Sequence, residues 1–417
     1  MGARMLAVLV LALPLAGCPT DVADPARPPP PPDAVVIGLL QPQPSGLEVQ
    51  REQAARLAIA EINAAGGVNG RPLALRVAYD NTNDPDTGVS SARLLEAGGV
   101  VALIGANASR VTLPVAEQVT IPAGLALISP GSTSPLISTL ADNDTVYRIP
   151  PSDALQGRLL AELVWDEGRT QVAIFGQDDP YGQGLREAFT TRFVELGGSI
   201  QAEAVFPTGR VSGYGAEISA LYASGTPTAI MLFAFAEQTS NLLREIVAAK
   251  GGLPPLYGVD ANMSQITLQN SPAQIAGMRG TVPSSPLGSA AYAIFRQAFV
   301  NATRVMPEPN RENSYDAVYL IALALARAGV NDRAAVATHL REVSRPDGPA
   351  AVTVLPGGFA GALAALQGGA DIDYEGASGP IDFDASGDPA AATYQYLEVQ
   401  LTAGGFELVT LQTIAYP

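Results

Sequence analysis

Short, continuously apolar runs rich in β-branched residues alternate along this chain with stretches of helical periodicity. The first run is VVIGLL at 35–40, and similar runs follow at 73–79, 100–104, 125–129, 171–176 and 228–233. The intervening segment 51–65 has the spacing of an amphipathic helix and ends at a glycine pair. Strands that are apolar at every position are buried on both faces, as in parallel sheets covered by helices. The pattern therefore predicts an α/β protein with doubly wound parallel sheets.

Length and charge restrict the domain organisation and the partners. Roughly 385 residues follow Asp33, which is more than one domain of about 100–200 residues, so two lobes are expected. The formal net charge of −16 disfavours a nucleic-acid partner, which requires a basic face, and also disfavours adhesion to anionic lipid. Because the chain has 1 Cys, no intrachain disulfide can form, and burial must hold the lobes together.

The amino terminus has the features of an export signal. Arg4 supplies a positive charge, and the apolar run 5–13 is too short to span a bilayer. Leu-Ala-Gly-Cys18 resembles the lipobox of bacterial lipoproteins, in which the cysteine is acylated and becomes the first mature residue. We therefore expect a signal peptide at 1–17, lipidation of Cys18 and a Pro-rich, polyproline II linker at 18–33. The alternative is a cleaved signal with a coincidental cysteine.

Two loops in the first half of the chain are candidates for binding an anion. In doubly wound sheets ligands bind at the carboxyl ends of the strands. After the strand at 100–104, Pro114 requires a helix that starts close to 109–112, and its first turn with the Ser109 hydroxyl could accept a carboxylate. After the next strand, Gly131 permits a close backbone approach, and Ser132 and Thr133 add hydroxyls. Alternatively, Ser109 merely caps its helix, and the second loop is simply a polar turn.

Two loops further along the chain are candidates for binding a cation. Tyr181 follows the strand at 171–176 and would present an aromatic face to an ammonium group. Asp260 follows a later strand and would neutralise such a group. Alternatively, Tyr181 is a surface tyrosine and Asp260 caps the next helix.

Other chemistries lack the residues that they need. Gly182-x-Gly184 has no third glycine for a dinucleotide site. Pro85 occupies the position at which a calcium loop requires glycine. The chain has 1 His, so the sequence contains no Cys/His metal cluster, and no nucleophile-elbow motif accompanies His339. We expect neither an enzyme nor a bound cofactor or metal.

The order of these loops resembles a known family. The segments that carry the resemblance include LAIAEINAAGGVNGRPL at 57–73, the loops at 102–116, 128–135 and 172–189, YDAV at 315–318 and GASGPIDFD at 376–384. They are similar to the branched-chain amino acid (Leu/Ile/Val) substrate-binding proteins of ABC transporters, which have the type 1 periplasmic binding fold. The resemblance covers essentially the whole body of the chain.

The resemblance implies two doubly wound lobes joined by three crossovers. We expect these crossovers near Pro150-Pro151, near Thr281-Val282 and near Gly379-Pro380. The first lobe would then comprise 34–150 and 282–378, and the second lobe 151–281 and 379–417.

The resemblance also implies how an amino acid is held by the first lobe. Ser109 and Thr133 take the ligand carboxylate, with Ser132 beside them. The Gly131 carbonyl takes part of the ammonium.

The second lobe supplies the other half of the implied site. Tyr181 covers the ligand, and Asp260 holds the ammonium where many relatives have Glu. Phe235 occupies a position at which the leucine-binding type has an aromatic hydroxyl. The first loop departs from the family, because Leu47 occupies a cleft-facing aromatic position, which affects side-chain specificity more than head-group recognition.

We therefore expect an extracytoplasmic solute-binding lipoprotein. It would capture an amino acid, a branched-chain one included, or a related amide, and deliver it to an ABC permease. The membrane would be reached through the lipid anchor only. The alternative is a regulatory or sensor lipoprotein that uses the same fold to contact a cell-envelope protein.

Overall fold

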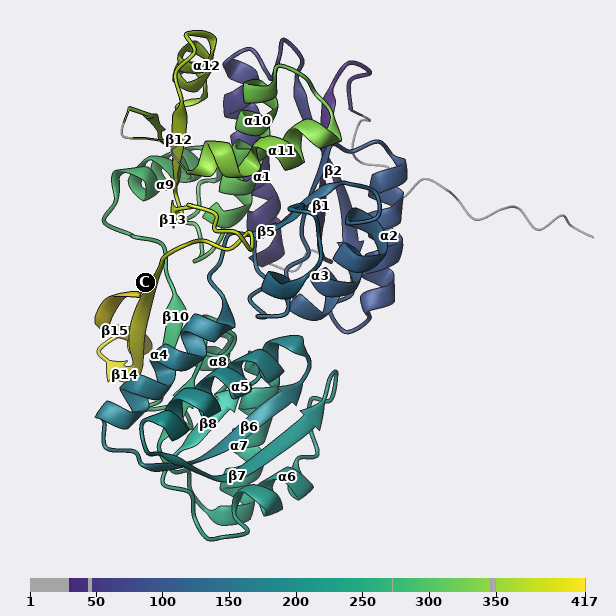
Figure 1. Ribbon diagram of the computed structural model, residues 1–417. Helices are drawn as coiled ribbons and strands as arrows, with labels where there is room; N and C mark the ends of the chain where they lie inside the picture. The colour runs from purple at the N-terminus through teal and green to yellow at the C-terminus, as the bar shows by residue number, and fades with distance from the viewer. Residues whose placement is uncertain (1–29, 44–46, 272, 346–347, 349, 417) are drawn as a thin grey trace, which may run out of the picture.

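A computed structural model describes residues 30–43, 47–271, 273–345, 348 and 350–416. The expected signal peptide, Cys18 and most of the linker lie outside these residues. The described chain forms two lobes, one above the other in Figure 1, and the predicted α/β fold is confirmed. Among the described residues, the helices are all too short or too polar to cross a membrane.

The first lobe is built on a five-stranded sheet in which every pair of neighbours is parallel. Its order is β2-β1-β3-β4-β5, with β1 (Val35–Pro42), β2 (Leu73–Asp80), β3 (Ala102–Ile104), β4 (Ala126–Ser129) and β5 (Val146–Arg148). Its helices are α1 (Leu47–Ala64), α2 (Pro85–Ala97), α3 (Ser109–Val115), α9 (Ala290–Thr303), α10 (Glu312–Ala328), α11 (Arg333–Ser344) and α12 (Phe359–Gln367).

Successive residues of β1 explain why its sequence is apolar throughout. Ile37 and Leu39 pack in the core cluster that contains α1 and α10, whereas Leu40 packs with α2 and α3. All three side chains are 0% exposed. Because side chains alternate across a strand, burial on both faces requires an apolar residue at every position.

The second lobe is built on a seven-stranded mixed sheet. Its order is β15-β14-β10-β9-β8-β6-β7, with β6 (Gln171–Asp178), β7 (Ser199–Pro207), β8 (Ile230–Phe233), β9 (Leu256–Gly258), β10 (Arg279–Pro283), β14 (Ala392–Thr402) and β15 (Gly405–Tyr416). The helices are α4 (Asp153–Asp166), α5 (Pro180–Glu195), α6 (Gly215–Leu221), α7 (Ala236–Lys250) and α8 (Gln265–Asn270).

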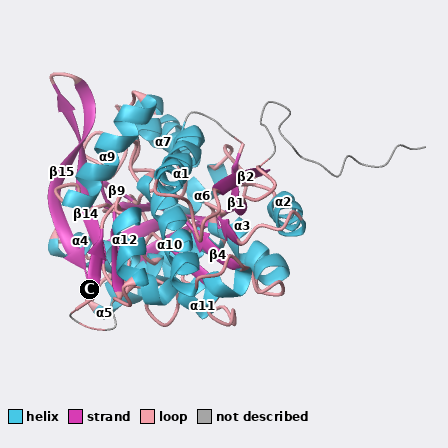
Figure 2. Ribbon diagram, turned by 90° about the horizontal axis from the view of Figure 1, so that it is seen from above, coloured by secondary structure: helices cyan, strands magenta, loops and turns pink. Residues whose placement is uncertain are grey.

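The antiparallel hairpin β14–β15 departs from the purely parallel sheets that the sequence predicts. It pairs with β10 and projects at one edge of the molecule in Figure 2. Buried and partly exposed residues largely alternate along β14, as expected for a strand with only one face in a core. The continuous apolar runs of the central strands do not have this alternation.

Three connections join the lobes, between β5 and α4, between β10 and α9, and between β13 and β14. β10 stays in the second sheet up to Pro283. Gly379–Pro380 forms β13, which pairs with β12 (Ile372–Gly376), itself beside β11 (Val352–Val354), and Phe383 lies in the core of the first lobe. The second connection therefore begins after Pro283, and the third begins after Phe383.

Two buried charges fix the segment that leads into the third crossover. Asp316 of α10 accepts hydrogen bonds from Tyr374 Oη at 2.7 Å and from the Ala377 and Ser378 backbone N–H groups at 3.0 and 2.8 Å. Arg148 Nε, at the end of β5, donates to Asp388 at 2.7 Å. The YDAV segment thus has a structural role, because its Asp anchors the β12–β13 turn.

We predict that Asp316→Ala lowers the free energy of unfolding by about 3 kcal/mol. The substitution leaves a buried tyrosine hydroxyl and two buried backbone N–H groups without their acceptor. Thermal and urea unfolding would measure the change. Asp373→Ala, a partly exposed aspartate on β12 beside Tyr374, is the control and should cost less than about 1 kcal/mol. Equal losses in the two variants would contradict the anchoring role.

Candidate ligand-binding site

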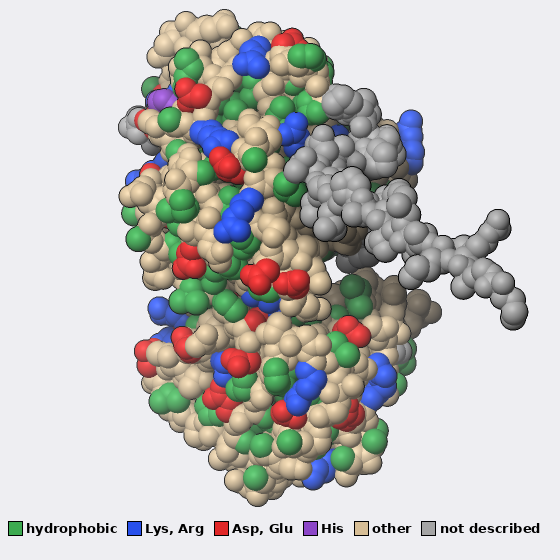
Figure 3. Space-filling model, turned by 90° about the vertical axis from the view of Figure 1, so that its right-hand side faces the viewer, with side chains coloured by type: hydrophobic (Ala, Val, Ile, Leu, Met, Phe, Trp, Pro, Cys, Tyr) green, Lys and Arg blue, Asp and Glu red, His purple; other side chains and the backbone are tan. Residues whose placement is uncertain are grey.

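The carboxyl ends of the two sheets face each other across the gap between the lobes. The loop and helix that follow β3 contact the helix that follows β6, since Arg110 of α3 reaches Asp179 at the start of α5. Figure 3 shows the constriction between the lobes from one side, with acidic and basic side chains interspersed above and below it. The candidate site therefore lies where parallel α/β sheets usually bind ligands.

The two loops predicted to bind an anion meet in the first lobe. Ser109 Oγ accepts hydrogen bonds from the backbone N–H groups of Thr133 at 3.3 Å and Ser134 at 3.1 Å. The N-cap residue of α3 is Ala108, so Ser109 does not cap this helix. Since a hydroxyl also carries one donor, the Ser109 O–H can still donate a hydrogen bond to a carboxylate.

Ser132 and Gly131 serve the loop itself rather than an open cleft. Ser132 Oγ lies 2.6 Å from Thr112 Oγ1 and 3.3 Å from the Ala106 carbonyl, so its hydroxyl is used inside the first lobe. The expected contact between the Ser132 side chain and a ligand stays a prediction. A Cβ atom on Gly131 would lie 2.9 Å from the Asn107 carbonyl oxygen, so the close approach there is to the protein's own backbone.

Three residues that the sequence assigns to the second lobe lie together there. Tyr181 Oη donates to Asp260 Oδ1 at 2.9 Å, and the Tyr181 ring stacks on Phe235 with centroids 5.4 Å apart. Tyr181 is 5% exposed, so it is not a surface tyrosine. Asp260 caps no helix either, because Ser264 is the N-cap of α8. The arrangement combines an acid with an aromatic wall.

Burial governs the electrostatics of the second lobe's acids. Burial raises the pKa of Asp260, while hydrogen bonds from Tyr181 and Gln156 oppose the rise. Asp153, at the start of α4, is 0% exposed, and burial together with the charge of Asp260 raises its pKa well above the usual value. The second lobe therefore offers carboxyl oxygens as hydrogen-bond acceptors, and a bound cation would stabilise their ionised forms.

Three contributors to the site were not singled out from the sequence. Asp153 joins the lobes, because its backbone N–H donates to the Thr133 carbonyl at 2.8 Å. Arg110 Nη1 lies 3.0 Å from Asp179 Oδ2 in the other lobe. Burial lowers the pKa of the Arg110 guanidinium, and the charges of Asp179 and Asp80 oppose that change. A cation beside Ser109 and an acid two residues before Tyr181 were the only sequence signals for this pair.

The family of the chain follows from its fold and from a family model. The model described as "Periplasmic binding protein" matches residues 34–404. The chain belongs to the periplasmic binding protein family. Its members are binding proteins and not enzymes, in agreement with the missing catalytic motifs.

Individual relatives of this binding protein are similar over most of their length. A Leu/Ile/Val-binding protein homolog 1 from Brucella abortus is 30% identical over 296 residues, covering 70% of this chain and 77% of the relative. The chemotactic signal transduction system substrate-binding protein BasB from Halobacterium salinarum is 28% identical over 377 residues, covering 89% and 86%. The leucine-binding protein LivK from Thermotoga maritima superimposes with a TM-score of 0.73 at 21% identity, covering 91% of this chain and 99% of LivK.

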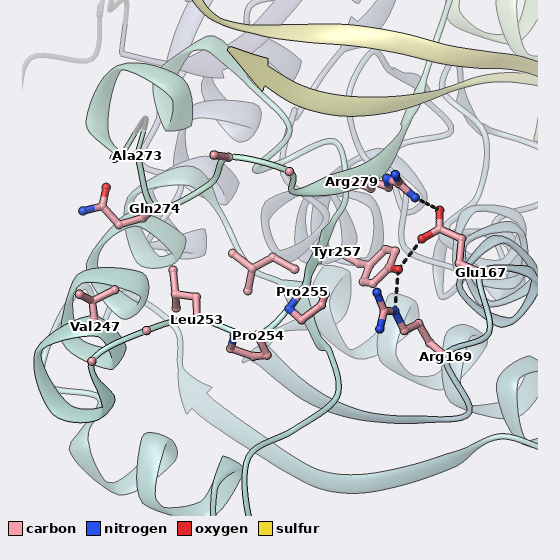
Figure 4. A pocket seen from close by; sticks show the side chains of 15 residues that line it. Glu167, Arg169, Val247, Leu253, Pro254, Pro255, Tyr257, Ala273, Gln274 and Arg279 are labelled. Atoms are coloured by element: carbon pink, nitrogen blue, oxygen red, sulfur yellow. Dashed lines mark hydrogen bonds and ion pairs between the residues drawn. The ribbon is translucent and has the colours of Figure 1, made fainter.

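A surface depression of about 680 Å³ in this binding protein lies away from the candidate site (Figure 4). It is lined by the amino ends of β9 and β10, opposite to the carboxyl ends that face the other lobe. Its charged groups already interact, because Glu167 contacts Arg279 at 2.8 Å and Arg169 contacts the Tyr257 hydroxyl. The depression therefore has no relation to the residues that the sequence selects.

We predict that Gly184→Ala hinders closure of the two lobes. A Cβ atom on Gly184 of α5 would lie 2.4 Å from Pro135 Cδ in the first lobe, and a proline ring cannot swing aside. Small-angle X-ray scattering with saturating L-leucine should show a larger radius of gyration than the parent protein. Gly361→Ala, in α12, is the control because a Cβ atom there meets nothing within 4 Å. Identical scattering of both variants and the parent would contradict this contact.

Proposed function

We propose that this binding protein captures an amino acid between its lobes and delivers it to an ABC permease. One observation carries the proposal: the paired Ser109 and Thr133 loops lie at the carboxyl ends of one sheet, and the Tyr181–Asp260 pair lies at the carboxyl ends of the other. One lobe thus offers donors for a carboxylate, and the other offers an acid for an ammonium group.

The first lobe would seat the carboxylate. Ser109 is held by two backbone N–H groups and is 3% exposed, so its hydroxyl has a fixed position. The Thr133 hydroxyl belongs to the loop that Ser109 ties down. A preorganised donor loses little entropy when the ligand arrives, which favours affinity.

The second lobe would seat the ammonium group and the side chain. Asp260 accepts one hydrogen bond from Tyr181 and, when ionised, has further lone pairs for an ammonium group. The stacked rings of Tyr181 and Phe235 form an apolar wall beside it. An apolar wall next to a zwitterion seat suits a branched-chain amino acid, and the similarity to the Leu/Ile/Val-binding homologue supports the same choice.

Ligand binding would favour the closed form because only that form contacts both ends of the zwitterion. Changing an open-to-closed ratio from 99:1 to 1:99 needs about 5.5 kcal/mol of differential binding. Hydrogen bonds to charged groups contribute about 1.5–3 kcal/mol each, so about two to four such bonds suffice. The closed shape is then the form that a permease would recognise.

The proposed lipid anchor on Cys18 would keep the protein at the outer side of a membrane. The sequence supports it with the Leu-Ala-Gly-Cys18 motif and the Pro-rich segment up to Asp33. Mass spectrometry of the membrane-extracted protein should find an acylated N-terminal cysteine. A cleaved, unmodified amino terminus in the soluble fraction would exclude the anchor.

A sensory role is the second candidate. The similarity to BasB, a substrate-binding protein of a chemotactic signal transduction system, favours it. Both roles use the same ligand site. If deletion of the protein abolishes uptake of the ligand, the role is transport. If deletion abolishes a behavioural response but uptake stays normal, the role is sensing.

We predict that Asp260→Asn weakens binding of the best branched-chain ligand about 100-fold or more. The substitution keeps the size of the side chain but removes the charge that faces the ammonium group, and burial makes that charge hard to replace. Isothermal titration calorimetry with L-leucine, L-isoleucine and L-valine would measure it. Asp178→Asn, an exposed neighbour of the same site loops, is the control. Unchanged affinity of the Asp260 variant would remove this residue from the site.

Affinity should also fall as the pH is lowered through the raised pKa of Asp260. The ionised form binds the ammonium group, and burial raises the pKa, so the loss begins at a higher pH than for an ordinary aspartate. Asp153, whose pKa is raised in the same cluster, acts in the same direction. Calorimetry between about pH 8 and pH 5 should show the fall in the parent protein. A much shallower slope is expected in Asp260→Asn, and equal slopes would contradict the role of this carboxylate.

A further inference from the structure

We propose that Arg110 and Asp179 form a latch across the cleft, in which Arg110 is a positioning residue that holds the Phe235–Tyr181 wall against the ligand seat. The latch contains no ligand atom, so it stabilises the closed form whether or not the cleft is occupied. The kinetic part of this inference rests on the proposed function, whereas the part about shape does not.

Arg110 is fixed to the first lobe. It follows Ser109 in α3, and its Nε donates to the Thr82 carbonyl in the loop between β2 and α2. Its Nη2 donates to Asn83 Oδ1 at 3.2 Å in the same loop. Two of the three guanidinium nitrogens therefore belong to the first lobe, and only Nη1 is left to cross the gap.

Asp179 is fixed with equal care in the second lobe. Its Oδ1 accepts the Gly182 backbone N–H at 2.9 Å and so caps α5. Its Oδ2 accepts Gln177 Nε2 at 3.0 Å and Arg110 Nη1 at 3.0 Å. The two side chains are 8% and 3% exposed, so salt and water screen this ion pair far less than a surface pair.

The Arg110 guanidinium also contacts the aromatic wall of the second lobe. Its central carbon lies 5.5 Å from the centroid of the Phe235 ring, which stacks on Tyr181, and Tyr181 donates to Asp260. Arg110 thus contacts Phe235, the first of three side chains in contact with one another, and the last of them is Asp260 at the proposed ammonium seat. A planar guanidinium can bridge a carboxylate and stack on a ring at once, which a lysine cannot do.

Opening of the lobes must separate Arg110 from Asp179 and from Phe235 together. Opening would break the Arg110–Asp179 hydrogen bond and the Arg110–Phe235 contact at the same time, and the latch opposes opening through these two contacts. We expect a compact ligand-free protein whose ligand exchange is limited by this separation.

Asp179→Asn is the main test, because Asn also caps helices and so α5 keeps its N-cap while the ion pair is lost. Small-angle X-ray scattering of the ligand-free variant should show a larger radius of gyration than the parent. Stopped-flow measurement with L-leucine, or with whichever of L-isoleucine and L-valine binds best, should show dissociation about tenfold faster or more. Glu203→Gln, which removes the Arg186–Glu203 pair within the second lobe, is the control and should change neither quantity.

Arg110→Met, alone and combined with Asp179→Asn in a double variant, tests whether the two residues act together or independently. Met keeps apolar contact with Phe235 but loses the charge, and the double variant should be no more expanded and no faster than Arg110→Met alone. Arg110→Lys should restore part of the compactness through its charge but leave dissociation fast, since it loses the stacking. Unchanged scattering in both single variants, or additive effects in the double variant, would overturn the latch. If no amino acid binds the parent protein, the proposed function fails, and the scattering comparison still decides the latch.

Discussion

Burial of the central strands on both faces is the constraint on which the rest of the structure depends. Ile37 and Leu39 pack on one layer of helices and Leu40 on the other, so the interior of the sheet has no place for polar chemistry. Polar side chains can then lie only where strands end, and parallel strands all end at one edge. The candidate site lies where the carboxyl-end edges of the two sheets face each other, so it needs no polar residue in the core of either lobe.

The two lobes solve opposite electrostatic problems. The first lobe fixes neutral donors, since Ser109 and its partner amides carry no net charge. The second lobe buries acids, and burial raises the pKa of Asp260 and Asp153. Charged acids are costly to bury without a partner, so the second lobe gains most from a cation. This division supports the proposal that the ligand is a zwitterion and not a simple anion or cation.

The sequence predicted much of the two sheets because apolar strand patterns are local. Apolar runs identified β1 to β4, β6 and β8 but not β9 or β10, and loops at strand ends were the basis for proposing Ser109, Thr133, Tyr181 and Asp260. The β14–β15 hairpin was missed because its antiparallel pairing with β10 depends on a contact distant in sequence. The hydrogen bond between Ser132 and Thr112 could not be predicted locally, because Thr112 lies in α3 and Ser132 in the loop after β4. The end of the segment in the first lobe also depends on tertiary pairing, since Gly379–Pro380 pairs with β12.

Arg110 and Asp179 show where local patterns stop being informative. Each has an ordinary local explanation, since Arg110 is a cation in the first turn of α3 and Asp179 is an acid that caps α5. Their pairing exists only when the lobes meet, so it is a property of the closed form and not of either lobe. Residues that touch the ligand can be inferred from the chemistry of the ligand, but residues that touch only the opposite lobe cannot. In the proposed mechanism, the affinity for a solute therefore depends partly on contacts between the lobes, such as Arg110–Asp179, that do not determine which solute is bound.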